Sequence, residues 1–370
     1  MNDCAHTPPV QPLQATRRAT RALQVGSVPL GAAHPVVVQS MCNTDTRDIE
    51  ATQAQVEALA HSGCELVRLA VLDEEAARAM RVLCDQAPVP LIADIHFDYR
   101  LAVQSLEAGV KGLRINPGNI GGEDKVDVVV DAAKAHGAVI RVGVNGGSLE
   151  KSLLAKYGGP TPEAMVESAL THVAMLERRG FYETKISLKS SSVRTTIGAY
   201  RLLATQCDYP LHIGVTEAGT LLRGSIKSAV GLGILLWEGI GDTLRVSLTH
   251  DPVAEAGVAY EILRALGLRQ RGPEIVSCPT CGRTEIGLIE LAQEVEERLR
   301  HVEEVFTVAV MGCVVNGPGE AREADIGLAG GRDLGIIFRK GEVIRKVKGE
   351  ALLAVFMEEL DRFLEERHAL

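Results

Sequence analysis

The sequence predicts an α/β protein in which a (β/α)8 barrel of the TIM type is followed by a small α+β domain. Eight short apolar segments alternate with segments of helical periodicity up to about residue 267, and the pattern changes after Gly272 and Pro273. In addition, 46% of the residues are apolar but only 4% are aromatic. The core is therefore built from the aliphatic side chains that suit parallel strands and the helices packed on them.

The predicted strands are short runs of β-branched and other apolar residues. The residues between them, such as 48–61 and 162–179, are rich in Ala, Leu and Glu with apolar residues every three to four positions, which is typical of crossover helices. Eight regular units favour a closed barrel, and a doubly wound open sheet is the alternative. The predicted strands are residues 36–41, 66–71, 90–96, 112–117, 138–145, 184–190, 210–216 and 243–249.

We expect three parts along the chain. Residues 1–20 form an N-terminal extension, residues 21–268 form the barrel, and residues 273–370 form the second domain. In the second domain strands and helices no longer alternate regularly, which is typical of an α+β fold. Its predicted elements are a helix at 285–299, a strand at 305–310, a glycine-rich loop, a strand at 325–328, a hairpin turning near Lys340 and Gly341, and a helix at 351–366.

Composition excludes several classes of protein. The formal net charge of −9 argues against binding to nucleic acid or to an anionic membrane, because no net positive field attracts a polyanion. No run of about 18 apolar residues and no signal-peptide core is found, so we expect a cytoplasmic protein. In a reducing compartment its eight cysteines are buried thiols or metal ligands rather than disulfides.

Polar side chains gather at the carboxyl ends of the predicted strands, where barrel enzymes have their active sites. Five cations lie on five different strands, and in an acidic protein they predict a local clamp for a phosphorylated substrate of at least two negative charges. For any single one of them, a salt bridge with a neighbouring carboxylate is an equally good interpretation. The cations are Arg68, Arg114, Arg141, Lys189 and Arg245, and the other polar residues at these ends are Asp94, His96, Asn116, Asn145 and Ser247.

Glu217 is the one carboxylate at the ends of the later strands. Its position suits a general acid or base, and it equally suits a counter-ion of Arg245. His96 is a weaker candidate, because a lone histidine is more often a structural residue.

Three cysteines in the second domain form a candidate metal centre. Cys278 and Cys281 make a CxxC motif at the start of a helix, and Cys313 lies in a glycine-rich loop. A redox dithiol is one alternative, but the thioredoxin-like sequence context that it requires is missing. A structural zinc site is another, but such a site requires a fourth Cys or His ligand. Three thiolates with one weaker position suit a catalytic 4Fe-4S cluster, and Glu320 is the nearest candidate for a fourth, oxygen ligand.

At this point the sequence resembles the 4-hydroxy-3-methylbut-2-enyl diphosphate synthases, in their bacterial two-domain form. The resemblance extends over roughly residues 20–365 and depends on long blocks rather than on a lone CxxC. The blocks are Cys278-Pro-Thr-Cys-Gly-Arg-Thr284, Met311-Gly-Cys-Val-Val-Asn-Gly-Pro-Gly-Glu320, Val37-Val-Gln-Ser-Met-Cys-Asn-Thr44, Leu113-Arg-Ile-Asn-Pro-Gly-Asn119, Arg141-Val-Gly-Val-Asn-Gly-Gly-Ser-Leu149 and Gly214-Val-Thr-Glu-Ala-Gly219.

The resemblance implies the reductive ring opening of 2-C-methyl-D-erythritol 2,4-cyclodiphosphate in isoprenoid biosynthesis. Electrons would enter singly through the cluster from reduced flavodoxin or ferredoxin. The implied cluster ligands are Cys278, Cys281, Cys313 and Glu320. Glu217 would be the catalytic acid, and the implied substrate contacts are Arg68, Arg114, Arg141 and Lys189, with Asn145, His96, Arg245 and Ser247 as further residues of the substrate site.

The resemblance also implies a homodimer, and the chain length agrees with it. The helix predicted near 252–266 runs away from the catalytic mouth, and the nine or so residues of 267–275 are a short tether. Two rival functions remain open from the sequence. One is a barrel enzyme that uses its cluster to reduce a different phosphorylated substrate, and the other is a binding protein with structural zinc at the CxxC motif.

Overall fold

The computed structural model describes residues 16–284, 286–313, 321–331 and 334–368. The chain divides into two compact units, Met1–Arg269 and Gln270–Leu370. Among the described residues no helix is both long enough and apolar enough to cross a membrane.

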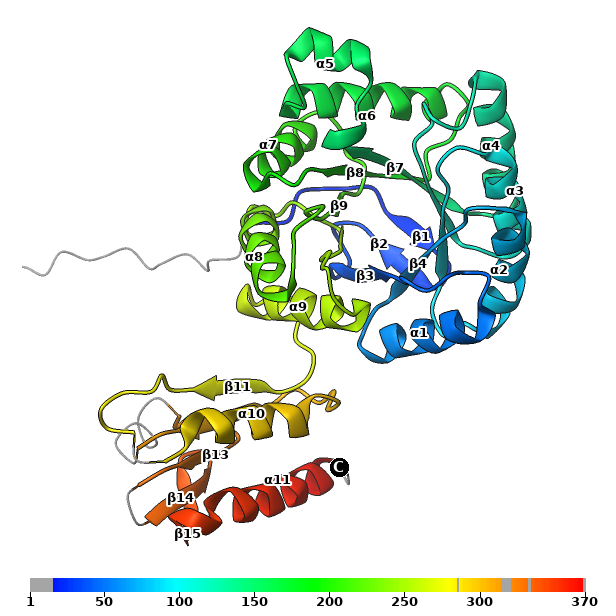
Figure 1. The fold of residues 1–370 in the computed structure, drawn as a ribbon. Helices are drawn as coiled ribbons and strands as arrows, with labels where there is room; N and C mark the ends of the chain where they lie inside the picture. The colour runs from blue at the N-terminus through cyan, green and yellow to red at the C-terminus, as the bar shows by residue number, and fades with distance from the viewer. Residues whose placement is uncertain (1–15, 285, 314–320, 332–333, 369–370) are drawn as a thin grey trace, which may run out of the picture. The chain divides into compact units, whose positions relative to one another are not determined.

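The first unit is a (β/α)8 barrel, which confirms the predicted fold class (Figure 1). Its parallel strands are hydrogen-bonded in the order β8-β7-β6-β5-β4-β3-β10-β9. A parallel bridge between Ile186 and Leu211 brings the two ends of this order together, so the ring is nearly closed. The strands are β3 (Val37–Met41), β4 (Leu66–Ala70), β5 (Leu91–Asp94), β6 (Gly112–Ile115), β7 (Val139–Asn145), β8 (Thr184–Lys189), β9 (His212–Ile213) and β10 (Thr243–Leu244).

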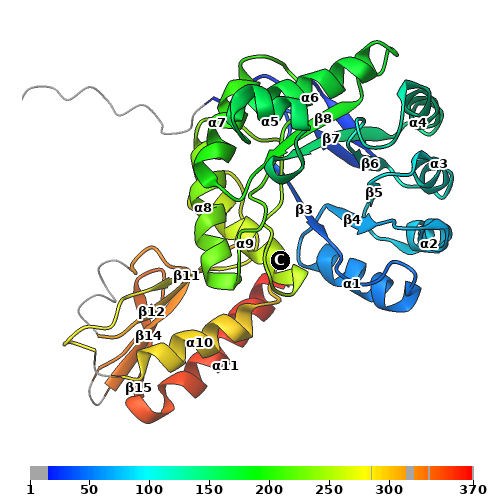
Figure 2. The same cartoon turned by 45° about the horizontal axis from the view of Figure 1, so that its top comes forward.

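Helices surround the ring of strands, as Figure 2 shows for α1 to α4. Most begin at a capping side chain, which fixes where the preceding loop ends and the helix begins. The capping residues include Asp48, Asp73, Asp98, Thr161, Ser192 and Asp251. The helices are α1 (Ile49–His61), α2 (Glu74–Gln86), α3 (Tyr99–Glu107), α4 (Glu123–Ala135), α5 (Lys151–Tyr157), α6 (Pro162–Glu177), α7 (Val193–Ala204), α8 (Leu221–Trp237) and α9 (Pro252–Ala265).

A short hairpin of β1 (Leu23–Val25) and β2 (Val28–Leu30) lies at the amino-terminal end of the barrel. This hairpin was not predicted, because each of its strands has only three residues. Its buried apolar side chains form one cluster with the first residues of several barrel strands. The amino-terminal end is therefore filled by aliphatic side chains, and the carboxyl end remains as the mouth. The members of the cluster are Leu23, Val25, Leu30, Val37, Leu66, Ile92 and Val139.

The second unit is a five-stranded mixed sheet with two helices, as the α+β prediction requires. Strands β11, β12 and β13 are parallel, whereas β14 and β15 are antiparallel and turn at Lys340 and Gly341, as predicted. The sequence analysis missed β11 and began the first helix three residues early. The elements are β11 (Glu274–Ser277), α10 (Leu288–Leu299), β12 (Thr307–Met311), β13 (Ile326–Ala329), β14 (Leu334–Arg339), β15 (Glu342–Lys348) and α11 (Leu352–His368).

Candidate active site

The inner wall of the barrel carries charged side chains. Because alternate residues of a strand point to the same face, Lys185, Ser187 and Lys189 of β8 all face the interior. The parallel register pairs Lys185 with Arg141 of β7, and it pairs Arg141 with Arg114 of β6. The interior of such a barrel is usually filled by layers of branched aliphatic side chains. A charged layer in that place indicates a binding site.

Asp94 compensates two of the predicted cations. Its carboxylate lies 3.6 Å from Arg68 Nε and 3.3 Å from Arg114 Nη1. Burial alone raises the pKa of the Asp94 carboxyl, but Arg68, Arg114 and Arg141 outweigh burial, so the pKa is lowered and the group is ionised. His96 stands at the edge of this cluster, with Nε2 4.0 Å from Asp94 Oδ1. Arg68 and Arg114 therefore form salt bridges with a neighbouring carboxylate, and they remain candidates for contacts with a phosphorylated substrate.

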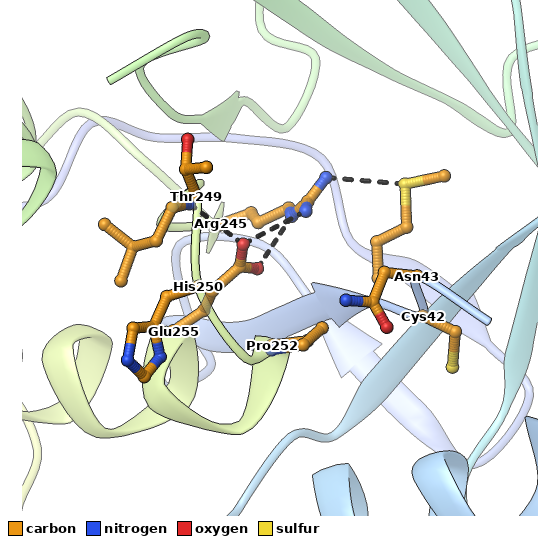
Figure 3. Close-up of a pocket in the computed structure, with 9 residues that line it drawn as sticks. Cys42, Asn43, Arg245, Thr249, His250, Pro252 and Glu255 are labelled. Atoms are coloured by element: carbon orange, nitrogen blue, oxygen red, sulfur yellow. Dashed lines mark hydrogen bonds and ion pairs between the residues drawn. The ribbon is translucent and has the colours of Figure 1, made fainter. Parts of the chain in front are cut away.

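Glu255 is the counter-ion of Arg245. Its two carboxylate oxygens accept from Arg245 Nε at 3.0 Å and Nη2 at 3.2 Å (Figure 3), and it also accepts from Ser40 Oγ at 2.7 Å. The suggestion that Glu217 is the counter-ion of Arg245 is therefore wrong. Glu255 was not predicted, because it lies not at a strand end but in the first turn of α9, where it is the acidic residue.

An open pocket of about 390 Å³ lies beside this ion pair, at the carboxyl ends of β3 and β10 (Figure 3). Cys42 lines it, and burial raises the pKa of the Cys42 thiol to about 12. The thiol is therefore protonated at neutral pH and is a poor nucleophile. The lining residues are Met41, Cys42, Asn43, Arg245, Leu248, Thr249, His250, Pro252 and Glu255.

Arg141 and Lys189 have no carboxylate partner among the described residues. Arg141 is only 2% exposed, donates from Nη1 to Ser187 Oγ at 3.3 Å, and leaves its buried Nε without a partner. Burial, and then the neighbouring cations, lowers the pKa of both side chains. A buried charge without a counter-ion is costly. Two such cations in one interior suit the binding of an anion.

Two glycines make room for these cations. A Cβ atom on Gly214 of the loop after β9 would lie 2.7 Å from Lys189 Nζ, and one on Gly143 of β7 would lie 2.9 Å from Arg114 Nε. Any side chain at either position would displace a charged group. Both glycines belong to the sequence blocks noted above, and the close approach explains why a residue without a side chain stands there.

The remaining predicted residues lie around the mouth. Glu217 is exposed on the loop after β9, with a φ of 51°. That left-handed conformation costs roughly 1–3 kcal/mol in a residue other than glycine, and such strain is concentrated at functional sites. Asn145 and Ser247 are half-buried at strand ends. Asn116 is different, because its Oδ1 accepts from Gly118 N at 3.1 Å and so supports a turn.

The cysteines of the second unit follow two neighbouring parallel strands. Cys278 comes directly after β11, and Gly312 and Cys313 come directly after β12, with Ser277 in register with Val310. Carboxyl ends of parallel strands share one edge of a sheet, and Cys278 Sγ accepts from Gly312 N at 3.2 Å.

Cys281 lies close to the same edge. Its backbone N donates to Thr284 Oγ1 at 3.0 Å, and a Cβ on Gly312 would touch that threonine. A hydrogen bond from the Arg283 backbone is the largest factor that lowers the pKa of the Cys281 thiol. A thiol that ionises readily is a better metal ligand.

The described residues do not contain a ready-made metal site of three or more His, Cys, Asp or Glu side chains. The predicted fourth ligand, Glu320, lies outside the described residues. A hydrogen bond from a backbone amide to Cys278 sulfur is nevertheless the kind of contact that cluster-bound thiolates receive. The donor set at this edge therefore fits an iron–sulfur cluster.

Two family descriptions match the chain. The GcpE TIM-barrel domain matches residues 20–260, and the GcpE protein C-terminal domain matches residues 274–362. Three similar curated proteins all bear the name 4-hydroxy-3-methylbut-2-en-1-yl diphosphate synthase (flavodoxin). They come from Maridesulfovibrio salexigens (72% identity; 95% of this chain and 98% of the relative), Nitratidesulfovibrio vulgaris (69%; 97% and 93%) and Geobacter sulfurreducens (61%; 94% and 99%).

Two of the solved structures similar to this chain show a distant likeness. Dihydropteroate synthase from Yersinia pestis has 14% identity and a TM-score of 0.47, over 66% of this chain and 97% of that chain. 3-Dehydroquinate dehydratase from Geobacillus kaustophilus has 12% identity and a TM-score of 0.49, over 67% of this chain and 98% of that chain.

Proposed function

The chain belongs to the GcpE family, and from this membership we propose that it is a flavodoxin-dependent 4-hydroxy-3-methylbut-2-en-1-yl diphosphate synthase. It is an oxidoreductase of isoprenoid biosynthesis that opens the ring of 2-C-methyl-D-erythritol 2,4-cyclodiphosphate. The relatives' name also supports reduced flavodoxin as the electron donor, rather than ferredoxin. The two rival functions, a different phosphorylated substrate and a zinc-stabilised binding protein, have no comparable support.

The observation that carries this proposal is the uncompensated positive charge inside the barrel. Arg141 and Lys189 are buried without a carboxylate partner among the described residues, and Arg68, Arg114 and Arg245 converge on the same interior. A cyclic diphosphate carries two ionised phosphates and offers oxygens to several donors at once. Charge-assisted hydrogen bonds from arginine suit it well. The first unit is therefore the proposed substrate-binding unit.

The overall reaction needs both electrons and a proton. Two electrons and one proton convert the cyclodiphosphate into the open diphosphate and one molecule of water. The bond from one carbon to a phosphate oxygen breaks, so the diphosphate, still attached at its other end, gains one negative charge. A hydroxyl group leaves a neighbouring carbon and takes the proton to become water. We assign the proton donor to Glu217, because its carboxyl group stands exposed at the mouth in a strained backbone conformation.

Asn145, Ser247 and His96 complete the proposed substrate site. Asn145 and Ser247 are half-buried at strand ends and offer neutral hydrogen-bonding groups beside the cations. His96 adds a ring nitrogen at the edge of the Asp94 cluster. These residues would orient the substrate, while the charged residues supply most of its binding free energy.

The proposed cofactor is a 4Fe-4S cluster held by Cys278, Cys281, Cys313 and Glu320 in the second unit. When bound, such a cluster supplies single electrons and, at the iron without a thiolate, a weakly held coordination position. The residues of this chain would hold the cluster and tune it through backbone amides such as Gly312 N.

The affinity for the cyclodiphosphate tests this function. Arg141→Ala and Arg114→Ala are each expected to weaken binding by roughly 10- to 100-fold, because a lost charge-assisted contact costs about 1.5–3 kcal/mol. Binding to anaerobically prepared protein is measured by calorimetry, and raised salt is expected to weaken the wild type. The control is Arg201→Ala, which removes an exposed arginine paired with Glu238. Unchanged affinity in both barrel variants would leave these residues with a purely structural role.

We also propose that the protein is a homodimer, and α8 offers a surface for it. Along this helix five apolar side chains recur every three or four positions, so they form a stripe on one face. A large exposed apolar patch marks an interaction site. The partner that fits this stripe best is a second copy of the same chain. A two-fold interface requires a self-complementary surface, and an apolar stripe can pack against the same stripe of another copy without repulsion between like charges. The stripe consists of Leu222 (72% exposed), Ile226 (57%), Val230 (50%), Ile234 (36%) and Trp237 (45%).

Ile226→Glu is expected to convert the dimer to a monomer, because two carboxylates would meet near the two-fold axis in an apolar interface. Light scattering coupled to size-exclusion chromatography gives the mass directly. The matched control is Val128→Glu on α4, where the wild-type side chain is 44% exposed and outside the stripe. A dimeric Ile226→Glu variant would exclude α8 as the interface, and a monomeric wild type would exclude the dimer.

A further inference from the structure

Lys185 is a buried cation that the proposed reaction does not use. It lies on β8, four residues before Lys189, and its side chain faces the barrel interior in register with Arg141. It is 2% exposed, and its Nζ has no hydrogen-bond partner among the described residues. A primary amine has three donors when charged, so a lack of partners is unusual for a buried ammonium group.

The groups that face Lys185 come from several strands and are mostly cations. Its electrostatic neighbours are Arg141 of β7, Arg68 of β4 and, before β10, Asp242. His212 of β9 also faces it, and the same histidine lies within the influence of Lys189. His212 offers no charge, since burial keeps its pKa well below the usual value and its Nδ1 is 2.7 Å from Thr243 Oγ1.

Asp242 is the carboxylate that acts electrostatically on Lys185, and its oxygens already accept hydrogen bonds from other groups. Its Oδ1 accepts from Arg17 Nη2 at 3.0 Å and from Thr20 Oγ1 at 2.9 Å, and its Oδ2 accepts from Leu211 N at 2.8 Å. The other carboxylates of the interior, Asp94 and Glu255, are paired with arginines. Lys185 therefore stands among cations without a counter-ion of its own.

Burial, followed by repulsion from Arg141 and Arg68, lowers the pKa of Lys185 to about 7. The amine form then predominates in the free protein above neutral pH. The Lys185 side chain belongs to the same inner layer as Arg141 and lies below Lys189, two of the residues assigned to the diphosphate. An anion bound there would reverse the sign of the potential at Nζ and favour the ammonium form.

We propose that Lys185 is a proton acceptor beneath the diphosphate: its amine is neutral in the free protein and takes a proton from solvent when the cyclodiphosphate binds. The inference rests on the proposed function, because that function supplies the anion. The proton adds one positive charge to the site only when negative charge is present. Without the anion, an uncharged Lys185 adds no further repulsion to the buried cations of the barrel. With the anion bound, the ammonium group of Lys185 compensates part of its negative charge.

The test is calorimetry of cyclodiphosphate binding to the oxidised, anaerobically prepared holoprotein, without reductant so that no turnover occurs. Titrations at pH 8 in HEPES and in Tris, which differ in ionisation enthalpy, give the protons taken up per site. With a free pKa of about 7, Lys185 is expected to contribute about 0.9 proton per site to the wild-type uptake at pH 8 and about 0.5 at pH 7.

Two variants separate the effect of a positive charge at position 185 from the effect of proton uptake there. Lys185→Arg keeps the charge but does not deprotonate in this range, so proton uptake should fall by about 0.9 per site while affinity at pH 8 is kept. Lys185→Met should lose both uptake and affinity, whereas Lys134→Met, at an exposed lysine of α4, should match the wild type.

The outcomes separate the inference from the proposed function. Tight binding by the wild type without proton uptake, or equal uptake by Lys185→Arg, would overturn the role of Lys185 and leave the function intact. If the wild type does not bind the cyclodiphosphate, the proposed function fails, and the role of Lys185 fails with it. If one of the two Lys185 variants fails to fold, the other decides the matter, because both remove the titrating amine and should lose about 0.9 proton of uptake per site at pH 8.

Discussion

Cys313→Ser is expected to abolish both bound iron and turnover. Cys313 follows β12 and is 7% exposed, so its thiol is held in a buried position after the strand. A cluster held by three thiolates and one weaker ligand loses a main anchor when one thiolate becomes a hydroxyl. Iron content, visible absorption and product formation are measured on protein purified without oxygen. Cys278→Ser and Cys281→Ser should behave alike.

The matched control is Cys207→Ser, which changes a half-buried barrel cysteine whose Sγ donates to Leu203 O at 3.7 Å. This variant should keep its iron and its activity. A Cys313→Ser protein with full iron content and normal turnover would contradict the cluster assignment. A wild-type protein that is colourless and carries zinc would contradict it as well.

The barrel was predictable because its signal is periodic. Eight apolar runs separated by amphipathic helices repeat the same unit, so an error in one strand does not change the fold. The elements missed are the ones without repetition. Strands β1 and β2 have three residues each, and β11 has four, so neither alternation nor composition distinguishes them from a loop. The buried residues of β1 and β2 contact barrel residues distant in sequence.

The site was only partly predictable. Alternation along a strand placed Arg141 and Lys189 in the interior, and the same rule applied to β8 gives Lys185, which was passed over because it does not end the strand. Glu255 was not predictable in this way, because a helix rather than a strand carries it to Arg245. Which cations have partners depends on packing between strands, so sequence spacing left the salt-bridge alternative open.

The proposed dimer has a consequence for where each active site forms. Helix α9 has 14 residues and begins after β10, so it runs about 21 Å from the carboxyl end of the strands toward the other end of the barrel. Only residues 266–273 separate it from β11, and eight residues reach at most about 28 Å when fully extended. A linker of this length is barely long enough to bring the cysteines of a chain to the mouth of the barrel in the same chain. We therefore expect each barrel to work with the cysteines of the partner.

Co-expression of Glu217→Gln with Cys313→Ser is expected to restore activity that neither variant has alone. Glu217→Gln keeps the shape of the side chain but removes its proton, so turnover should fall by about 10² to 10⁴ while the cluster remains. In a mixed dimer whose sites form between chains, one site combines an intact barrel with intact cysteines. Random pairing of equal amounts should then give about a quarter of wild-type activity.

Sites that form within one chain predict the opposite result, because every chain in the mixture carries a defect and no activity returns. Adding Ile226→Glu to both chains provides the control, since it should prevent pairing through α8 and remove the restored activity. Restored activity that survives this change would mean that the chains pair through another surface. The proportion of mixed dimers, measured by differential tags, should track the recovered turnover, because the two quantities count the same species.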